Sequence, residues 1–258
     1  KDSRIVDLIY CPKCEHELVY DFQRHHHIGQ VHCTNCDFKS LEADLVGTLM
    51  DHKLSVQLKD KNLSFDVLGD NSTDHYNLLA AISLFSYLGF DLQAIQAELN
   101  KLKIVKTRFD QVEVKGKQIT IMMTKDQNPI ATSRVFDYIA HQTNRKIALI
   151  LINENSEHHT LSENNAWYYD ADFEYLKQDH IMQIIGGGFR VLDLKVRVAL
   201  SGISLERYCS TLKELDTSNL VDLERIDSIY ILNGTKNIPE AKLIRKQLIE
   251  RIEREAVQ

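Results

Sequence analysis

The sequence predicts an α/β protein in which a small four-cysteine unit precedes a domain built around a parallel sheet. Two observations carry this prediction. Four of the five cysteines stand in two C-x-x-C pairs near the start of the chain. Further on, short and fully apolar runs alternate with segments of helical periodicity, which is typical of a doubly wound sheet covered by helices on both faces.

The composition is that of an ordinary globular protein, and it argues against several classes of protein. The chain has 258 residues, 43% hydrophobic and 26% charged, with a net charge of -6. This mildly acidic total disfavours a nucleic-acid binder, which usually carries a basic excess. The sequence shows neither a membrane-spanning run of about 18 apolar residues nor a signal peptide at its start. We therefore expect a cytoplasmic protein without a transmembrane segment.

The cysteine pairs predict a structural zinc site. The pairs C-P-K-C and C-T-N-C are separated by residues 15–32, the spacing of a zinc ribbon, and a hairpin of residues 18–22 and 28–32 would bring them together. Four thiolates leave no open position for a catalytic water. A disulfide pair is disfavoured in a reducing cytosol, and a redox C-x-x-C needs no second copy. The predicted ligands are Cys11, Cys14, Cys33 and Cys36.

A hairpin and two helices are expected after the ribbon. Residues 54–58 and 63–67 alternate apolar and polar side chains around D-K-N. Residues 77–88 are almost continuously apolar, which predicts a helix buried on most of its faces. Residues 92–102 have helical periodicity, with Asp91 as a plausible N-cap.

A polar, charged stretch at residues 103–110 marks a domain boundary, giving expected domains of 1–107 and 108–258. The second domain should begin with a hairpin of residues 111–114 and 118–123. Its expected buried parallel strands are residues 146–152, 181–185 and 228–232, and its expected helices are residues 129–143, 190–200, 219–225 and 239–256.

Ligands of such sheets bind beyond the carboxyl ends of the strands. The segment I-G-G-G-F-R at residues 185–190 could let backbone N–H groups approach an anion, but it could equally be a tight turn. Residues 153–172 contain the only tryptophan, two tyrosines and several carboxylates, and are either a functional loop or a solvated one.

Several motifs together resemble the MurT family, the Mur-ligase-like subunits of lipid II isoglutaminyl synthases. They are the four-cysteine ribbon, Y-N-L-L-A-A, T-R-F-D-Q-V-E-V, K-x-x-N-P, W-Y-Y-D-A-D-F-E and G-G-F-R-V-x-D. The resemblance implies that the ribbon is inserted in the remainder of a Mur-ligase central domain, followed by a Rossmann-like C-terminal domain.

The resemblance also implies a function: ATP- and Mg²⁺-dependent amidation of the D-glutamate α-carboxylate in the stem peptide of lipid II. Ammonia would come from a glutaminase partner in a heterodimer. The family's P-loop would precede the ribbon, and no such pattern occurs in this sequence. We therefore expect this chain to be inactive alone. A rival hypothesis is a non-catalytic zinc-ribbon scaffold or regulatory module that binds a partner enzyme.

By resemblance, nucleotide-site positions fall on Asn77, Arg108, Lys125 and Asn128. The family's C-terminal domain supplies an aspartate that completes the Cys–His pair of the glutaminase, and Asp170 is our candidate. The sequence departs from the family where D-x-S-W is usual, because Asn164 replaces the aspartate, while Asp170 and Asp172 are kept. The K-x-x-N-P turn carries two extra residues, and Asp74 stands where an asparagine is usual.

Overall fold

A computed structural model describes residues 6–23, 28–51, 53–58, 61–67, 72–102, 109–124, 128–152 and 166–255. The chain divides into two units. One contains residues 10–21 and 30–105, and the other contains residues 1–9, 22–29 and 106–258.

The four-cysteine segment is a two-stranded ribbon of β1 (Leu18–Gln23) and β2 (Gly29–Cys33). Each C-x-x-C turn is closed by a backbone hydrogen bond: the N–H of Cys11 donates to the His16 carbonyl at 2.7 Å, and that of Cys33 to the Phe38 carbonyl at 2.8 Å. Glu15 has a φ of 61°, the left-handed conformation that lets the first turn reverse direction. The expected hairpin is confirmed.

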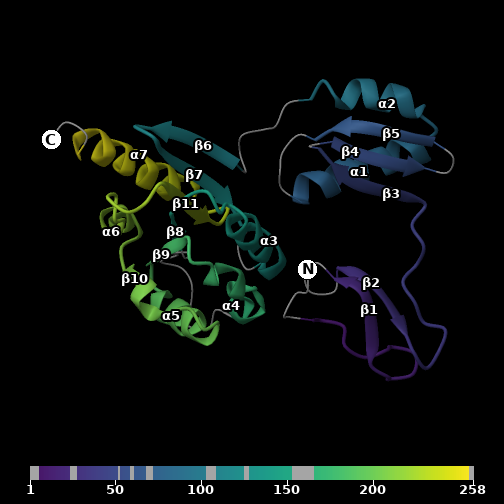
Figure 1. Cartoon of the computed structure of the whole chain (residues 1–258), viewed down its shortest axis with the longest axis horizontal. Coiled ribbons are helices and arrows are strands. Elements are labelled where there is room, and N and C mark those ends of the chain that lie inside the picture. The colour runs from purple at the N-terminus through teal and green to yellow at the C-terminus, as the bar shows by residue number, and fades with distance from the viewer. Residues whose placement is uncertain are drawn as a thin grey trace. The chain divides into compact units, whose positions relative to one another are not determined.

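An antiparallel sheet and two helices follow the ribbon (Figure 1). The strands are β3 (Leu45–Met50), β4 (Lys53–Leu58) and β5 (Lys61–Asp66), and the helices are α1 (Ser72–Tyr87) and α2 (Leu92–Leu99). Val56, Phe65 and Ile82 are fully buried at the centre of their core. The side chain of Asp91 caps α2 by accepting from the backbone N–H groups of Gln93 and Ala94, as expected.

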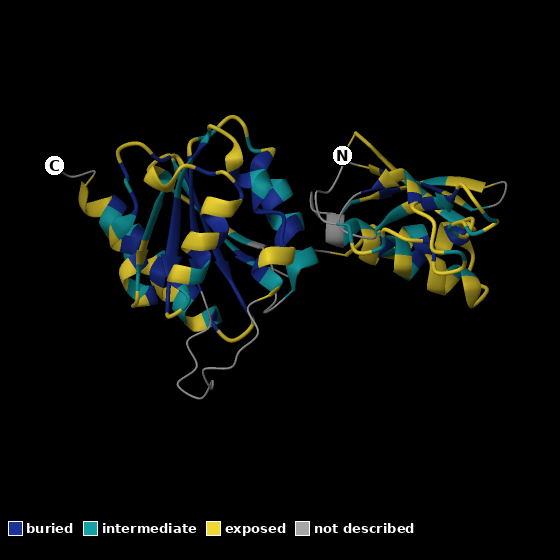
Figure 2. Ribbon diagram, turned by 90° about the horizontal axis from the view of Figure 1, so that it is seen from below, coloured by how far each residue is buried: buried dark blue, intermediate teal, exposed yellow. Residues whose placement is uncertain are grey.

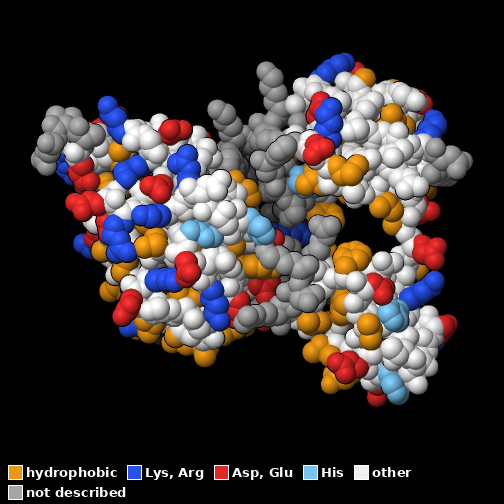
Figure 3. Space-filling model, in the orientation of Figure 1, with side chains coloured by type: hydrophobic (Ala, Val, Ile, Leu, Met, Phe, Trp, Pro, Cys, Tyr) orange, Lys and Arg blue, Asp and Glu red, His pale blue; other side chains and the backbone are white. Residues whose placement is uncertain are grey.

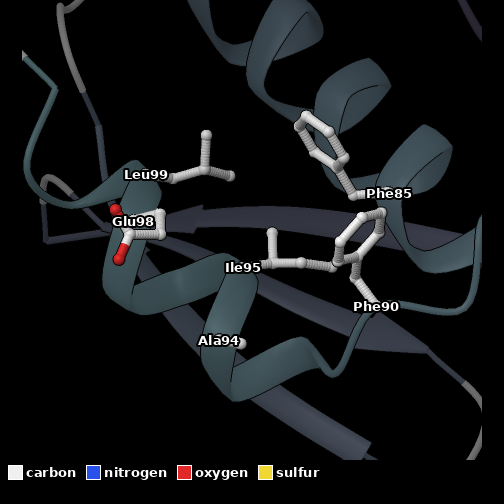
Figure 4. A pocket seen from close by; sticks show the side chains of 6 residues that line it. All are labelled: Phe85, Phe90, Ala94, Ile95, Glu98 and Leu99. Carbon is white, nitrogen blue, oxygen red and sulfur yellow. The ribbon is translucent and has the colours of Figure 1, made fainter.

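The prediction that α1 is buried on most faces is wrong. Leu84, Tyr87 and Leu88 are exposed, because the three-stranded sheet and the short α2 cover only one side of this helix. Figure 4 shows a small apolar pocket between the end of α1 and α2, where Phe85 and Phe90 meet edge to face at 5.8 Å between ring centroids. The continuous apolar run thus indicated the helix correctly but not its burial.

A six-stranded sheet organises the C-terminal unit (Figure 1). Its order is β10-β9-β8-β11-β7-β6, with all neighbours parallel except β6, which pairs antiparallel to β7. The strands are β6 (Phe109–Val114), β7 (Lys117–Met123), β8 (Ile147–Ile152), β9 (Ile181–Gly187), β10 (Tyr208–Thr211) and β11 (Ser228–Asn233). The three predicted parallel strands are confirmed.

Two apolar cores, one on each face, bury the centre of this sheet. Along β8, Leu149 and Leu151 face one core while Ile150 and Ile152 face the other, as the two-residue period of a strand requires. The first core lies under α3 (Pro129–Ala140), α4 (Trp167–Asp170), the 3-10 helix η1 (Phe173–Lys177) and α5 (Val191–Leu200), and the second under α6 (Thr217–Leu220) and α7 (Ile238–Glu255). Figure 2 shows the buried strands between exposed helix surfaces.

Some expected elements differ from the observed ones. The helix expected at residues 219–225 does not form: α6 ends at Leu220, and residues 223–225 make a single turn, in which the N–H of Ile226 donates to the Asp222 carbonyl at 3.1 Å. Strands β3 and β10 were not expected. Among the described residues, none of the helices has both the length and the apolar character needed to cross a membrane.

Candidate functional site

The four predicted thiols converge at the end of the ribbon. Their sulfur atoms all lie within 4.8 Å of one another. The Sγ atoms of Cys11 and Cys36 are 3.6 Å apart, and those of Cys14 and Cys33 are 3.5 Å apart. Tetrahedral zinc with bonds of about 2.3 Å requires sulfur atoms about 3.8 Å apart, so the spacing fits one ion. These cysteines are free, and their separations exceed the roughly 2 Å of a disulfide.

Backbone and electrostatic features of the cluster favour a bound cation. The N–H groups of Lys13 and Asn35 each donate to a cluster sulfur at 3.4 Å. A backbone hydrogen bond at His16 is the largest cause that lowers the pKa of Cys14 to about 6. The pKa of Cys36 rises to about 12: a backbone hydrogen bond from Phe38 lowers it, but desolvation and the adjacent thiols outweigh that effect. Four thiolates this close therefore need a cation to coexist.

Of the four predicted nucleotide-site residues, two lie outside the described ranges and the other two belong to different units. Arg108 and Lys125 lie outside the described ranges. Asn77 is exposed on α1 in one unit, and Asn128 precedes α3 in the other. The Asn128 side chain caps α3, because its Oδ1 accepts from the backbone N–H of Ala131 at 2.9 Å. A nucleotide role for these residues stays a prediction.

Asp170 is the last residue of α4, where its side chain is exposed. Asp172, two residues on, is buried, and its backbone N–H donates to the Ser133 hydroxyl at 2.9 Å. Of the two carboxylates kept from the family motif, only Asp170 can therefore meet a partner from solvent. Asn164 and residues 153–165 lie outside the described residues.

Arg197 of α5 holds this aromatic–acidic segment in place, a role that the sequence did not suggest. Its Nε donates to the Tyr168 carbonyl at 2.9 Å and its Nη2 to the Ala171 carbonyl at 2.7 Å. The same guanidinium pairs with the Glu174 carboxylate at 2.9 Å and lies 5.0 Å from the centroid of the Phe173 ring. The residues that Arg197 contacts precede and follow Asp170 in the chain, so these contacts fix the backbone that carries Asp170.

Replacing Arg197 by methionine should cost about 3–5 kcal/mol of the free energy of unfolding, because the buried carbonyls and Glu174 would lose their donor. Chemical denaturation of the two proteins measures this difference. Arg225→Met is a matched control: Arg225 is exposed, with its Nε 3.9 Å from Asp222, and its loss should cost less than about 1 kcal/mol. Equal losses in both variants would contradict the assigned role of Arg197.

The glycine run is explained by packing. A Cβ on Gly186 would lie 2.6 Å from the Tyr208 hydroxyl, and one on Gly187 would lie 2.7 Å from Thr217 Cγ2. Gly188 has a φ of 109°, which side-chain-bearing residues rarely adopt. Of the two interpretations of this segment, the structure supports the tight strand-to-helix turn.

The fold is that of the Mur ligases. The C-terminal sheet and its helices, with the preceding unit, resemble a pseudomurein peptide ligase type C from Methanothermus fervidus at a TM-score of 0.65 and 19% identity, over 94% of this chain and 49% of that one. MurF from Acinetobacter baumannii has a TM-score of 0.59 and 13% identity, over 80% of this chain and 45% of that one.

Within this class, the chain is MurT-like. Residues 126–235 match the family model described as MurT ligase C-terminal. The chain is 28% identical to the MurT subunit of lipid II isoglutaminyl synthase (glutamine-hydrolyzing) from Staphylococcus aureus, over 80% of this chain and 47% of the relative. The chain is 24% identical to the corresponding subunit from Streptococcus pneumoniae, over 87% of this chain and 49% of the relative. The chain thus spans about half the length of these curated relatives, and the resemblance inferred from the sequence motifs is confirmed.

Proposed function

We propose that the chain is part of a ligase subunit that amidates the D-glutamate α-carboxylate in the stem peptide of lipid II, using ATP and ammonia. The observation that carries this proposal is the match of residues 126–235 to the MurT ligase C-terminal family, within a Mur-ligase fold. The named relatives are subunits of a glutamine-hydrolysing lipid II isoglutaminyl synthase, which supports the same substrate and amide donor here.

The proposed reaction has two steps. The γ-phosphoryl group of ATP passes to the carboxylate, and ammonia then attacks the acyl phosphate, forming the amide and releasing phosphate. When bound, Mg²⁺ neutralises charge on the transferring phosphoryl group. Arg108 and Lys125 would add positive charge near it, and Asn77 and Asn128 would contact the nucleotide.

Zinc is proposed to stabilise the ribbon without taking part in this reaction. Four cysteine thiolates complete the coordination of the ion, which leaves no position for substrate or water. The two short strands have little apolar area to bury, so the ion would supply much of the folding energy of this segment.

The amide nitrogen is proposed to come from a glutaminase subunit bound as a heterodimer. In such an enzyme a cysteine attacks glutamine and a histidine moves the proton, and a carboxylate is needed to orient the histidine. Asp170 is proposed to supply that carboxylate across the interface. Its exposure at the end of α4 and the fixed backbone around it suit this role.

Ammonium chloride as nitrogen donor tests the ligase function independently of the partner. The native full-length protein, incubated with lipid II, ATP and Mg²⁺, should convert the carboxylate to the amide, which mass spectrometry of the stem peptide detects. Omitting ATP should abolish the product. A protein that binds a partner enzyme but gives no amide under these conditions would instead support the scaffold hypothesis.

A further inference from the structure

The turn between β11 and α7 contains two buried asparagines whose side-chain oxygens have no hydrogen-bond donor within the described part of the chain. Asn233, the last residue of β11, is 1% exposed, and Asn237, immediately before α7, is 4% exposed. The Oδ1 atom of each is buried and accepts no hydrogen bond from any described residue. We call these two side chains the asparagine pair.

The backbone around the asparagine pair is well hydrogen-bonded. The N–H of Ala241 donates to the Asn237 carbonyl at 3.0 Å, and that of Thr124 donates to the Asn233 carbonyl at 3.1 Å. The Nδ2 of Asn233 donates to the Gly234 carbonyl at 2.7 Å. Buried polar side-chain atoms are nearly always paired, so two unpaired acceptors in an otherwise bonded turn indicate that a molecule with hydrogen-bond donors binds there.

The asparagine pair lies at a crevice of the kind that holds ligands in doubly wound sheets. Strands β8 and β11 are neighbours. The helices that follow β8 pack in the first core, whereas α7, which follows β11, lies over β7 and β6 in the second. Connections that diverge in this way open a crevice at the carboxyl ends of the two strands. Thr235 and Lys236 of the same turn are exposed, so the turn reaches from the core to solvent.

The chemistry of this position selects a small, neutral hydrogen-bond donor. Amide oxygens accept hydrogen bonds, and the burial of both Oδ1 atoms favours a small molecule over a bulky one. Figure 3 shows charged side chains of both signs on the surface of the C-terminal unit, whereas the asparagine pair is uncharged and buried. The N-terminus of α7, an 18-residue helix, carries a partial positive charge that disfavours a cation. Pro239, the second residue of α7, has no N–H for Asn237 to accept.

We propose that Asn233 and Asn237 bind the ammonia that attacks the acyl phosphate. The inference rests on the proposed function and names the residues that hold its nitrogen substrate. Ammonia would donate two N–H groups to the Oδ1 atoms, which leaves its lone pair free to attack. The positive end of α7 favours neutral ammonia over ammonium, and only the neutral form has that lone pair.

The neighbouring strand connects the asparagine pair with the proposed nucleotide site. Strand β7 pairs with β11, and Thr124, at its end, donates to the Asn233 carbonyl. Lys125, which is proposed to lie near the transferring phosphoryl group, is the next residue in the chain. The two reactants would therefore meet at the carboxyl ends of adjacent strands.

The test measures ammonium-dependent amidation by the native full-length protein, with ammonium chloride varied at saturating ATP and lipid II. Asn237→Ala should raise the KM for ammonium at least about tenfold, because ammonia loses an acceptor, and should change the KM for ATP less than about twofold. Its thermal unfolding midpoint should stay within about 2 °C of the wild type, since the Oδ1 has no hydrogen bond to lose within the described residues.

Gln183→Ala is the matched control, because both ends of this amide are paired within the protein. Its Nε2 donates to the Leu220 carbonyl at 3.1 Å, and its Oε1 accepts from the Asp222 N–H at 2.9 Å. This variant should lower the unfolding midpoint by about 4 °C or more and leave the KM for ammonium within about twofold.

Circular dichroism establishes whether each variant is folded, and Asn237→Leu, which has nearly the same shape, replaces the alanine variant if that one is not. A wild-type protein that forms no amide from ammonium would remove the proposed function itself. Amidation by the wild type with an unchanged KM for ammonium in the variant would assign the amide oxygens to ordered water and overturn only this inference. A raised KM for lipid II alone would assign them to the stem peptide and also overturn it.

Discussion

Replacing Asp170 by asparagine should lower glutamine hydrolysis by the complex about 10²- to 10⁴-fold. An amide can accept a hydrogen bond but cannot stabilise the imidazolium that forms in the partner, and loss of this charge has an effect of that size in enzymes with a Ser–His–Asp triad. The side chain is exposed, so folding should be unaffected. Glutaminase activity of the wild-type and variant complexes measures the effect, and amidation with free ammonium should persist.

Asp179→Asn is the control for this prediction. Asp179 is fully exposed in the same unit, where it pairs with Arg207 at 3.2 Å, so its variant should keep wild-type glutaminase activity. If the Asp170 variant also keeps its activity within about twofold, Asp170 is not the cross-subunit acid.

Changing both Cys11 and Cys33 to serine should eliminate bound zinc and unfold the ribbon. Binding of structural zinc contributes about 10–16 kcal/mol in isolated zinc fingers, far more than the small ribbon core can replace. Metal analysis of the purified protein should find one zinc per chain in the wild type and none in the variant. Limited proteolysis should cut the variant between the two cysteine pairs.

Cys209→Ser controls for the general loss of a thiol. Cys209 lies on β10 in the C-terminal unit, where desolvation raises its pKa, and its loss should leave zinc bound. If the wild-type protein contains no zinc, the prediction of a metal site is wrong, whatever the variants show.

The central sheet was predictable because its strands are buried on both faces. The run I-A-L-I-L-I has no polar interruption, and only a strand covered by helices on both sides needs that pattern. Edge strands gave weaker signals. Strand β10 has only four residues, Y-C-S-T, none of them fully buried, and β3 mixes exposed Val46 and Leu49 with the rest. The burial of α1 could not be judged from its sequence, since an apolar run does not say how many neighbours cover it.

Parts of the candidate site could also be predicted from the sequence, and other parts could not. The spacing of the four cysteines in the sequence predicts that their thiols lie close together, because two short turns on one hairpin can adopt only a few arrangements. The role of Arg197 depends on long-range contacts with residues 168–174, which no local pattern encodes. One signal was available: in V-L-D-L-K-V-R-V-A-L, Arg197 falls beside the buried face at helical spacing from Val191 and Leu194. A charged residue at such a position usually has a specific partner.

Transfer of nitrogen from glutamine to lipid II is the reaction that tests the proposed function most directly. The native full-length protein and the glutaminase subunit would be incubated with lipid II, ATP and glutamine labelled with ¹⁵N at its amide. The proposed function predicts ¹⁵N at the α-carboxamide of the stem-peptide D-glutamate, with one ATP consumed per amide formed. Hydrolysis of glutamine without label in lipid II, in a complex that is correctly assembled, would contradict it.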